Sequence, residues 1–204
     1  MPYANIAEVS TCLSDCIDYC QKHQDIDYCE HHLPHMLDVK NEMKEAWATT
    51  DKHFARWKRE AGEDKLSWKN LAKLLREVQR KLERIDAIGY PDRRVMYWDE
   101  AILENAAREM MDYLAEHTGN IDFAEDYLTR MEQLIDTAHG EHDQSEDALR
   151  SYRRFFRQRR DALSNAYHVI GEFRESMRRN LGKDHPDYQS IRWAWSVSPD
   201  ETVL

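Results

Sequence analysis

The residues best suited to chemistry lie together near the N-terminus, between positions 12 and 35. All four cysteines of the 204-residue chain fall in this stretch, with four of its ten histidines. Cys20 and His23 are separated by two residues, and Cys29 and His32 repeat that spacing. Thiolate sulfur and imidazole nitrogen are ligands that tetrahedral zinc prefers. The spacing predicts one zinc ion, or a softer metal such as copper, held by these four residues and by Cys16, which can replace a histidine.

The same cysteines also have an interpretation that needs no metal. Cys16 and Cys20 extend an apolar pattern that begins with Val9 and Leu13, at steps of three and four residues. A buried free cysteine behaves as a small hydrophobic residue. We favour this interpretation and expect no cofactor, with the single zinc ion as the alternative. A disulfide between Cys20 and Cys29 is less favoured, because the clustering of the cysteines is not typical of a secreted disulfide framework.

Helices must position these residues, because apolar side chains recur at steps of three and four along most of the chain. The chain has only six glycines and five prolines, which also favours helix. The sequence predicts an all-α fold, an antiparallel bundle of five to six helices in which the last helix, about residues 143–182, is the longest. The apolar patterns occupy residues 6–20, 33–61, 68–85, 95–117, 121–138 and 149–181.

Helix-breaking residues separate these patterns. We expect stops near residues 25–27, 89–92, 118–120 and 139–143, and at Gly62 and Gly182. Pro34 suits the first turn of a helix, where a missing N–H leaves no hydrogen bond unmade, and Asn120 suits an N-cap. Lys40 and Arg159 fall on apolar patterns, so each needs a carboxylate partner or a place at a helix edge.

Residues 1–182 are expected to form the helical domain, and residues 183–204 a C-terminal arm. After one helical turn, apolar side chains alternate with others at Ile191, Trp193, Trp195 and Val197. That period of two predicts an extended segment with one apolar edge. The two tryptophans are expected to make the arm dock, on its own bundle rather than on a neighbouring subunit.

An arginine-rich segment, residues 150–160, stands out in a chain of net charge −10. Arginines beside aromatic residues can bind a phosphate backbone or stack on bases. The chain is acidic overall, so we favour ion pairs with acidic helices, within the chain or across an interface. Nucleic-acid binding is the disfavoured alternative. The interaction candidates in this segment are Arg150, Arg153, Arg154 and Arg157.

The motifs of common enzyme classes do not occur in the sequence. It has no phosphate-binding loop, dinucleotide fingerprint or nucleophile motif, and no Glu-x2-His pair of the kind that di-iron bundles require. No apolar run of 18 residues occurs, and the N-terminus lacks the pattern of a secretory signal. We expect a non-enzymatic interaction or scaffold subunit in the cytoplasm, which binds a protein partner or itself and no membrane. The alternatives are a metal-binding protein that uses the N-terminal cluster and a nucleic-acid-associated subunit.

Overall fold

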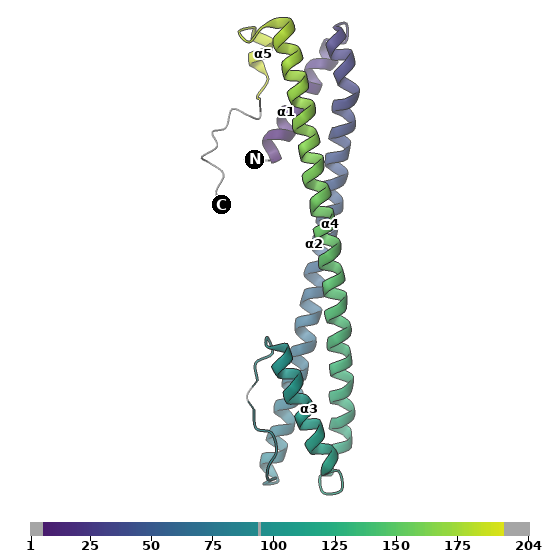
Figure 1. Ribbon diagram of the computed structural model, residues 1–204, viewed down its shortest axis with the longest axis vertical. Coiled ribbons are helices and arrows are strands. Elements are labelled where there is room, and N and C mark those ends of the chain that lie inside the picture. Colours follow the sequence, from purple (N-terminus) through teal and green to yellow (C-terminus); the bar gives the residue numbers. More distant parts are fainter. Residues whose placement is uncertain (1–5, 94, 194–204) are drawn as a thin grey trace. The chain divides into compact units, whose positions relative to one another are not determined.

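The computed structural model describes residues 6–93 and 95–193, and within them every regular element is a helix (Figure 1). This confirms the all-α prediction for the described part of the chain. In chain order the helices are α1 (Ile6–Lys22), α2 (Asp27–Arg84), α3 (Glu100–Glu116), α4 (Ala124–Leu181) and α5 (Pro186–Ser190).

The chain divides into two compact units. Unit 1 takes Met1–Lys52 and Arg153–Leu204, and unit 2 takes His53–Tyr152. Helices α2 and α4 therefore contribute one part to each unit, whereas α1 and α5 belong to unit 1 and α3 to unit 2. This division does not test the predicted boundary at residue 183 between a helical domain and a C-terminal arm. That boundary stays a prediction.

Unit 1 is built around α1, which packs on the unit 1 parts of α2 and α4 (Figure 1). Phe173 of α4 is fully buried and lies against Tyr19, Tyr28 and His32, with ring centroids 6.2, 6.2 and 5.7 Å away. His32 Nε2 also lies 2.9 Å from Ser176 Oγ, which joins α2 to α4 by a hydrogen bond. Aromatic packing and one buried polar contact thus hold the three helices together.

Unit 2 is built around α3, which buries one face against α2 and α4. Leu103 and Met110 of α3 and Met131 of α4 are completely buried. The hydroxyl of Tyr127 on α4 donates a hydrogen bond to the carboxylate of Glu77 on α2, and this bond lowers the pKa of Glu77. The buried face of α3 runs through Leu103, Ala106, Met110 and Leu114 at steps of three and four residues, whereas Ile102, which the sequence pattern put on this face, is 50% exposed.

Two of the expected interruptions lie inside helices, and so does one residue that was expected in a first turn. Gly62 lies inside α2, Gly140 lies inside α4, and Pro34 lies inside α2 rather than in its first turn. A single glycine inside a helix costs only about 1 kcal/mol relative to alanine. The packing of the residues on either side is therefore enough to keep the helix continuous. The predicted segments 33–61 and 68–85 are therefore one helix, and so are 121–138 and 149–181.

Other predicted stops have different outcomes. Gly182 directly after α4 has a φ angle of +84°, which favours glycine, whereas α2 ends at Arg84, before the predicted stop at 89–92, and the residue with positive φ next to its end is Asp86 at +51°. The Gly182 N–H donates to Arg178 O at 3.0 Å and closes the last turn of α4, as expected for a helix C-cap. Asn120 is not an N-cap, because α4 begins four residues later at Ala124.

The two charged residues on the apolar patterns have different outcomes. Lys40 is exposed and its predicted core position is wrong, because the buried face of α2 runs through Met36, Val39 and Met43 instead. The side chain of Arg159 is 23% exposed and meets the stated requirement, since it lies 3.6 Å from Asp51 Oδ1. Its guanidinium also lies 4.3 Å from the ring centroid of Trp47, a cation–π contact.

The described part of the C-terminal segment packs on unit 1. Ile191 is buried in the unit 1 core, and Arg192 forms an ion pair of 3.1 Å with Asp15 of α1. Trp193 donates its indole N–H to the carbonyl of Tyr188 at 2.9 Å. Trp195 and Val197 lie outside the described residues, so the docking of the whole arm stays a prediction.

Candidate metal centre

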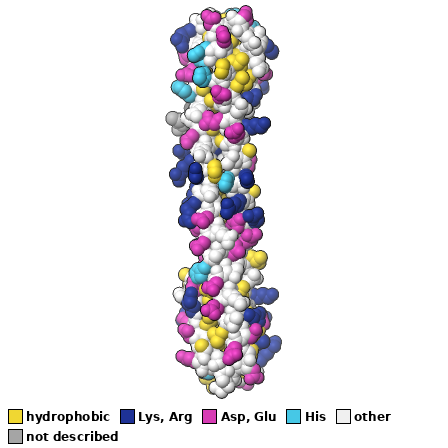
Figure 2. Space-filling view, turned by 90° about the vertical axis from the view of Figure 1, so that its right-hand side faces the viewer, with side chains coloured by type: hydrophobic (Ala, Val, Ile, Leu, Met, Phe, Trp, Pro, Cys, Tyr) yellow, Lys and Arg dark blue, Asp and Glu magenta, His cyan; other side chains and the backbone are white. Residues whose placement is uncertain are grey.

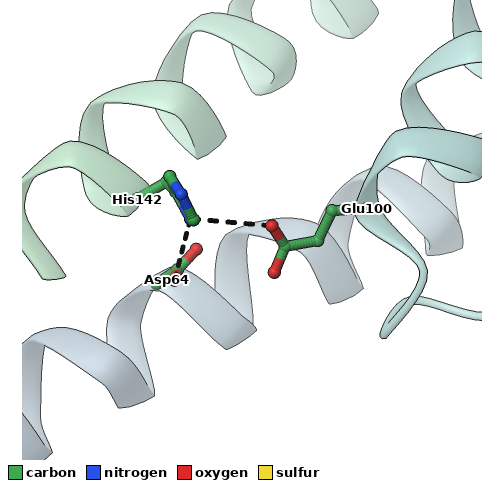
Figure 3. A group of neighbouring side chains, drawn as sticks. All are labelled: Asp64, Glu100 and His142. Atoms are coloured by element: carbon green, nitrogen blue, oxygen red, sulfur yellow. Dashed lines mark ion pairs between the residues drawn. The ribbon is translucent and has the colours of Figure 1, made fainter. Parts of the chain in front are cut away.

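Three side chains from three helices meet in unit 2, as Figure 3 shows. Asp64 comes from α2, Glu100 is the first residue of α3, and His142 comes from α4. One ligand atom from each residue lies within 4.8 Å of the other two. The cluster forms because α3 starts where the polar edges of α2 and α4 face each other.

The distances within this cluster match those around one metal ion. His142 Nδ1 lies 3.5 Å from Asp64 Oδ2 and 3.6 Å from Glu100 Oε2. Two ligands that each lie about 2.1 Å from a tetrahedral zinc ion are separated by about 3.4 Å. A protonated histidine between two carboxylates gives similar distances, so the geometry fits either a metal ion or an imidazolium ion.

Two buried atoms of the cluster make no hydrogen bond. They are Asp64 Oδ1 and His142 Nδ1, neither of which has a hydrogen-bond partner within the described ranges. A buried polar atom without a partner costs about 1–3 kcal/mol. The side chain of Asp64 is only 14% exposed, so water offers it little compensation. A cation between the three side chains would give His142 Nδ1 a partner, beside the Asp64 Oδ2 atom that lies 3.5 Å from it.

Burial and neighbouring charges shift the pKa of Glu100 in this cluster. Burial raises the pKa of the Glu100 carboxyl, and the negative charge of Asp64 raises it further, while His142 acts in the opposite direction. One turn further along α3, Glu104 accepts hydrogen bonds from Arg108 and lies 3.2 Å from His139 Nε2. These contacts lower the pKa of Glu104. Glu104 therefore has its own partners, whereas the ion pairs of Glu100 and Asp64 within the described part of the chain are both with His142.

A second acidic group lies next to this cluster in the sequence. Glu60, Glu63 and Glu141 bring their carboxylate oxygens within 4.8 Å of one another. Glu60 is only 5% exposed, but Arg59 at 2.6 Å and Arg56 at 3.7 Å neutralise its charge. Because two arginines already hold Glu60, this group is less suited to a cation than the cluster with His142.

The donor atoms of the cluster define what it can bind. Two carboxylates and one imidazole suit divalent ions such as Zn²⁺, Fe²⁺ or Mn²⁺. The two negative charges would balance a divalent cation. The side chains of Glu100 and His142 are 42% and 44% exposed, which leaves room for a water ligand at a fourth position.

The structure places the predicted N-terminal ligands in unit 1, where they do not form one group. Cys16, Cys20 and Cys29 are fully buried in the apolar core. The ring of His23 lies 4.4 Å from that of Tyr19, while His32 is hydrogen-bonded to Ser176. In the residues described, neither set of three clustered ligands includes any of the five predicted ones. Zinc binding by these five residues stays a prediction.

The arginine-rich segment, residues 150–160, lies within α4, and the boundary between the two units falls inside it, after Tyr152. Arg150 is exposed in unit 2 and forms an ion pair of 2.5 Å with Asp147. The other three predicted residues are exposed in unit 1; they are Arg153, Arg154 and Arg157. Basic and acidic side chains are intermixed over the face drawn in Figure 2. Binding of nucleic acid or protein by these arginines stays a prediction.

Sequence reasoning missed Asp64, Glu100 and His142. Asp64 and His142 are 78 positions apart, and no local spacing connects them with Glu100. Residues 139–143 were assigned to a helix break, which hid the fact that His142 lies on a continuous helix opposite Asp64. The pairing of α2 with α4 was the missing information.

Comparisons with known proteins give no further assignment, because no family model, curated protein or solved structure matches the chain. Among the described residues, no helix is both long and apolar enough to cross a membrane.

Proposed function

We propose that this protein binds one divalent transition-metal ion through Asp64, Glu100 and His142 in unit 2. The observation that carries the proposal is the convergence of these three donors from three helices, with ligand atoms 3.5 and 3.6 Å apart. The unpartnered His142 Nδ1 supports it, because a cation at the three donors would give this buried atom a partner. A bound ion would connect the start of α3 to α2 and α4 and so stabilise unit 2.

Zinc is the first ion to test, because it binds N and O ligands more tightly than Mn²⁺ or Fe²⁺. The full chain, treated with a chelator and then dialysed, is titrated with Zn²⁺ by calorimetry, and native mass spectrometry counts the bound ions. We expect one equivalent per chain. Replacing His142 by alanine should weaken binding by more than about tenfold, the loss that even a residue supporting a ligand can cause.

A matched control is available in unit 1. His168 lies 3.2 Å from Glu172 on the exposed surface of α4, so it is also a histidine paired with a carboxylate. His168→Ala should leave zinc binding unchanged. The proposal fails if the wild-type chain binds no equivalent, or if His142→Ala binds zinc as tightly as His168→Ala does. In that case a proton on His142 explains the cluster.

A second proposal keeps the expectation from the sequence: a non-enzymatic interaction or scaffold subunit, built from antiparallel helices. Two contacts within unit 1, Asp51 with Arg159 and His32 with Ser176, support the antiparallel pairing of α2 and α4 there. Large apolar side chains around the α2–α3 connection support an interaction role. Four of these side chains are at least half exposed: Ile88 (90%), Trp98 (66%), Met96 (56%) and Ile102 (50%). Exposed apolar groups of this kind mark interfaces.

Light scattering during size-exclusion chromatography tests self-association. We expect a mass above that of the monomer, and a lower mass when Ile88 and Trp98 are both replaced by serine. Leu37 of unit 1, which is 38% exposed, offers a control, and Leu37→Ser should not change the mass. A strictly monomeric wild-type chain over the whole concentration range would contradict self-association.

A further inference from the structure

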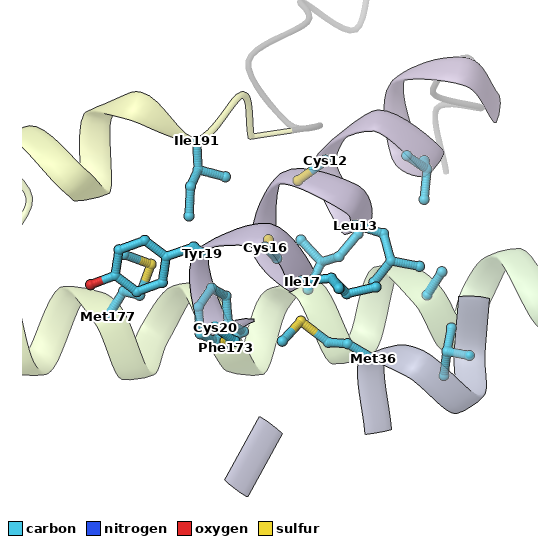
Figure 4. Close-up of a cluster of buried hydrophobic side chains, with 14 of the residues drawn as sticks. Cys12, Leu13, Cys16, Ile17, Tyr19, Cys20, Met36, Phe173, Met177 and Ile191 are labelled. Carbon is cyan, nitrogen blue, oxygen red and sulfur yellow. The ribbon is translucent and has the colours of Figure 1, made fainter. Parts of the chain in front are cut away.

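Two histidines on the surface of unit 1 take no part in the sites described above. His31 and His35 are four residues apart in α2, which is helical over both although Pro34 lies between them. Side chains four positions apart are neighbours on the surface of a helix. Figure 4 shows Met36, the next residue after His35, in the core of unit 1 with Phe173. One face of α2 is therefore buried here, whereas both histidines are exposed.

The two imidazole rings lie close enough to bind one ion together. Their centroids are 6.1 Å apart. A metal ion lies about 3.2 Å from the centroid of a ring that binds it, because the metal–nitrogen distance is about 2.1 Å. Two rings bound to one ion therefore have centroids about 4.5 Å apart at a right angle and about 6.4 Å apart in a straight line. The observed distance falls in this range, and rotation about the bonds of these exposed side chains can close it toward the right angle.

The ring nitrogens of this pair are not engaged by other groups in the described part of the chain. There, His31 and His35 make no hydrogen bond or ion pair, and their ring contacts are with each other and, for His31, with His32. The neighbouring His32 is different, because its Nε2 atom lies 2.9 Å from Ser176 Oγ and is hydrogen-bonded to it. The exposed pair can therefore bind a ligand without breaking a contact of the fold.

We propose that His31 and His35 chelate one Cu²⁺ ion, each through one imidazole nitrogen, with water at the remaining positions. Imidazole suits copper, nickel and zinc, and the affinity of divalent first-row ions is highest for Cu²⁺. Copper also prefers a tetragonal arrangement, in which neighbouring ligands meet at a right angle. Two histidines four residues apart on one helix occupy neighbouring positions on a metal, as they do in zinc proteases. The proposal uses none of the residues of the candidate metal centre, so either can fail without the other.

Acidic side chains continue the same exposed stripe of α2 on both sides of the pair. Asp27, the first residue of the helix, lies four residues before His31, and Asp38 lies three residues after His35. Both aspartates are exposed, and their negative charges favour a cation on this stripe. Binding changes no oxidation state. Two copper–nitrogen bonds form, and two water molecules leave the hydrated ion.

The test is a titration of the full chain with Cu²⁺ in competition with glycine, at a pH where imidazole is neutral. Electron paramagnetic resonance should detect two imidazole nitrogens on one copper ion. The His142→Ala variant, which lacks a ligand of the candidate metal centre, should keep this signal. Unfolding the chain after copper uptake should still reveal four thiols, which shows that copper was bound and was not reduced by cysteine.

Single and double substitutions distinguish a chelate from two independent histidines. His31→Ala and His35→Ala should each weaken copper binding by more than about tenfold, a loss that even a residue supporting a ligand can cause. The double variant should add little to either loss, because a single remaining histidine no longer chelates. His168→Ala is the matched control, since it removes another exposed histidine of unit 1, and it should leave copper binding unchanged.

The side chains replaced in these variants are exposed, and circular dichroism verifies that each variant is helical. The proposal is overturned if the two single losses add in the double variant, or if His168→Ala weakens binding as much as His31→Ala does. The wild-type chain also decides by itself. A signal from a single nitrogen, or fewer than four thiols after copper uptake, would contradict a copper chelate at this pair.

Discussion

The two units are built from similar helices but differ in where they place the thiol, carboxylate and imidazole groups that can act as metal ligands. Each combines a portion of α2 and α4 with one helix of 17 residues, α1 in unit 1 and α3 in unit 2. In unit 1 the thiols are completely buried, whereas in unit 2 the side chains of Glu100 and His142 remain 42% and 44% exposed.

The difference follows from the cost of removing each group from water. A neutral thiol loses little on burial and behaves as a small apolar group. A carboxylate loses several kcal/mol unless it is paired, so carboxylate donors stay near the edge of a core. The same helical framework can therefore offer soft sulfur donors inside one unit and hard oxygen donors at the margin of the other.

The largest expected effect tests whether the two units unfold separately. Phe173→Ala in unit 1 should lower the free energy of unfolding by about 3–5 kcal/mol, because it removes a fully buried ring. Hydrogen exchange measured by mass spectrometry should then accelerate in α1 and much less in α3.

The matched change in unit 2 is Met131→Ala, which also truncates a completely buried side chain and should cost about 2–5 kcal/mol. Here exchange should accelerate in α3 rather than in α1. If each substitution accelerates exchange equally in both units, they unfold as one cooperative body and the comparison loses its basis.

The next effect concerns zinc. At a free concentration of about 100 times Kd, a bound ion should stabilise the folded state by about 2.7 kcal/mol. Because the three ligands all belong to unit 2, we expect slower exchange in α3 and around Asp64 and His142. Protection that appears only in α1 would show that zinc binds the unit 1 cysteines and histidines instead.

A smaller effect is the response of the two units to acid. Burial lowers the pKa of His32 in unit 1 from 6.5, so below pH 6.5 the unfolded chain takes up a proton that the folded chain does not. Stability from this group is therefore lost as pH falls from 6.5 to the lowered pKa. The Tyr127 hydrogen bond lowers the pKa of Glu77 in unit 2 from 4.5, so that contribution is complete above pH 4.5 and is lost only as pH falls through the lowered value.

Urea unfolding at several pH values, combined with hydrogen exchange, should show that unit 1 weakens between pH 7 and 5 before unit 2 does. His32→Gln should reduce the loss in unit 1, and Tyr127→Phe should reduce the later loss in unit 2. An unchanged pH profile for His32→Gln would show that another group controls the acid response of unit 1.

The smallest effects come from two arginines of α4. Arg159→Ala in unit 1 should cost about 1 kcal/mol, because the guanidinium loses its contact with the Trp47 ring as well as the ion pair with Asp51. Arg150→Ala in unit 2 should cause no measurable change, since its side chain and that of Asp147 are 67% and 69% exposed. Thermal unfolding measures both, and an equal loss would mean that the Trp47 contact adds nothing.

By itself the sequence determined the helical class and the end of α4 at Gly182. Steps of three and four residues depend only on local geometry, and a glycine at positive φ can end a helix without distant contacts. It also indicated that Cys16 and Cys20 lie on the apolar face of α1 with Leu13, where the structure buries them.

Tertiary structure alone decided the continuity of α2 and α4 and the meeting of Asp64, Glu100 and His142. Packing on both sides outweighs the modest preference of Gly62 and Gly140 to interrupt a helix, and that packing depends on partners far away in the chain. In the same way, donors on three helices come together only when α3 takes its place between α2 and α4. Local spacing cannot encode this arrangement, because it results from the burial of apolar faces that belong to different helices.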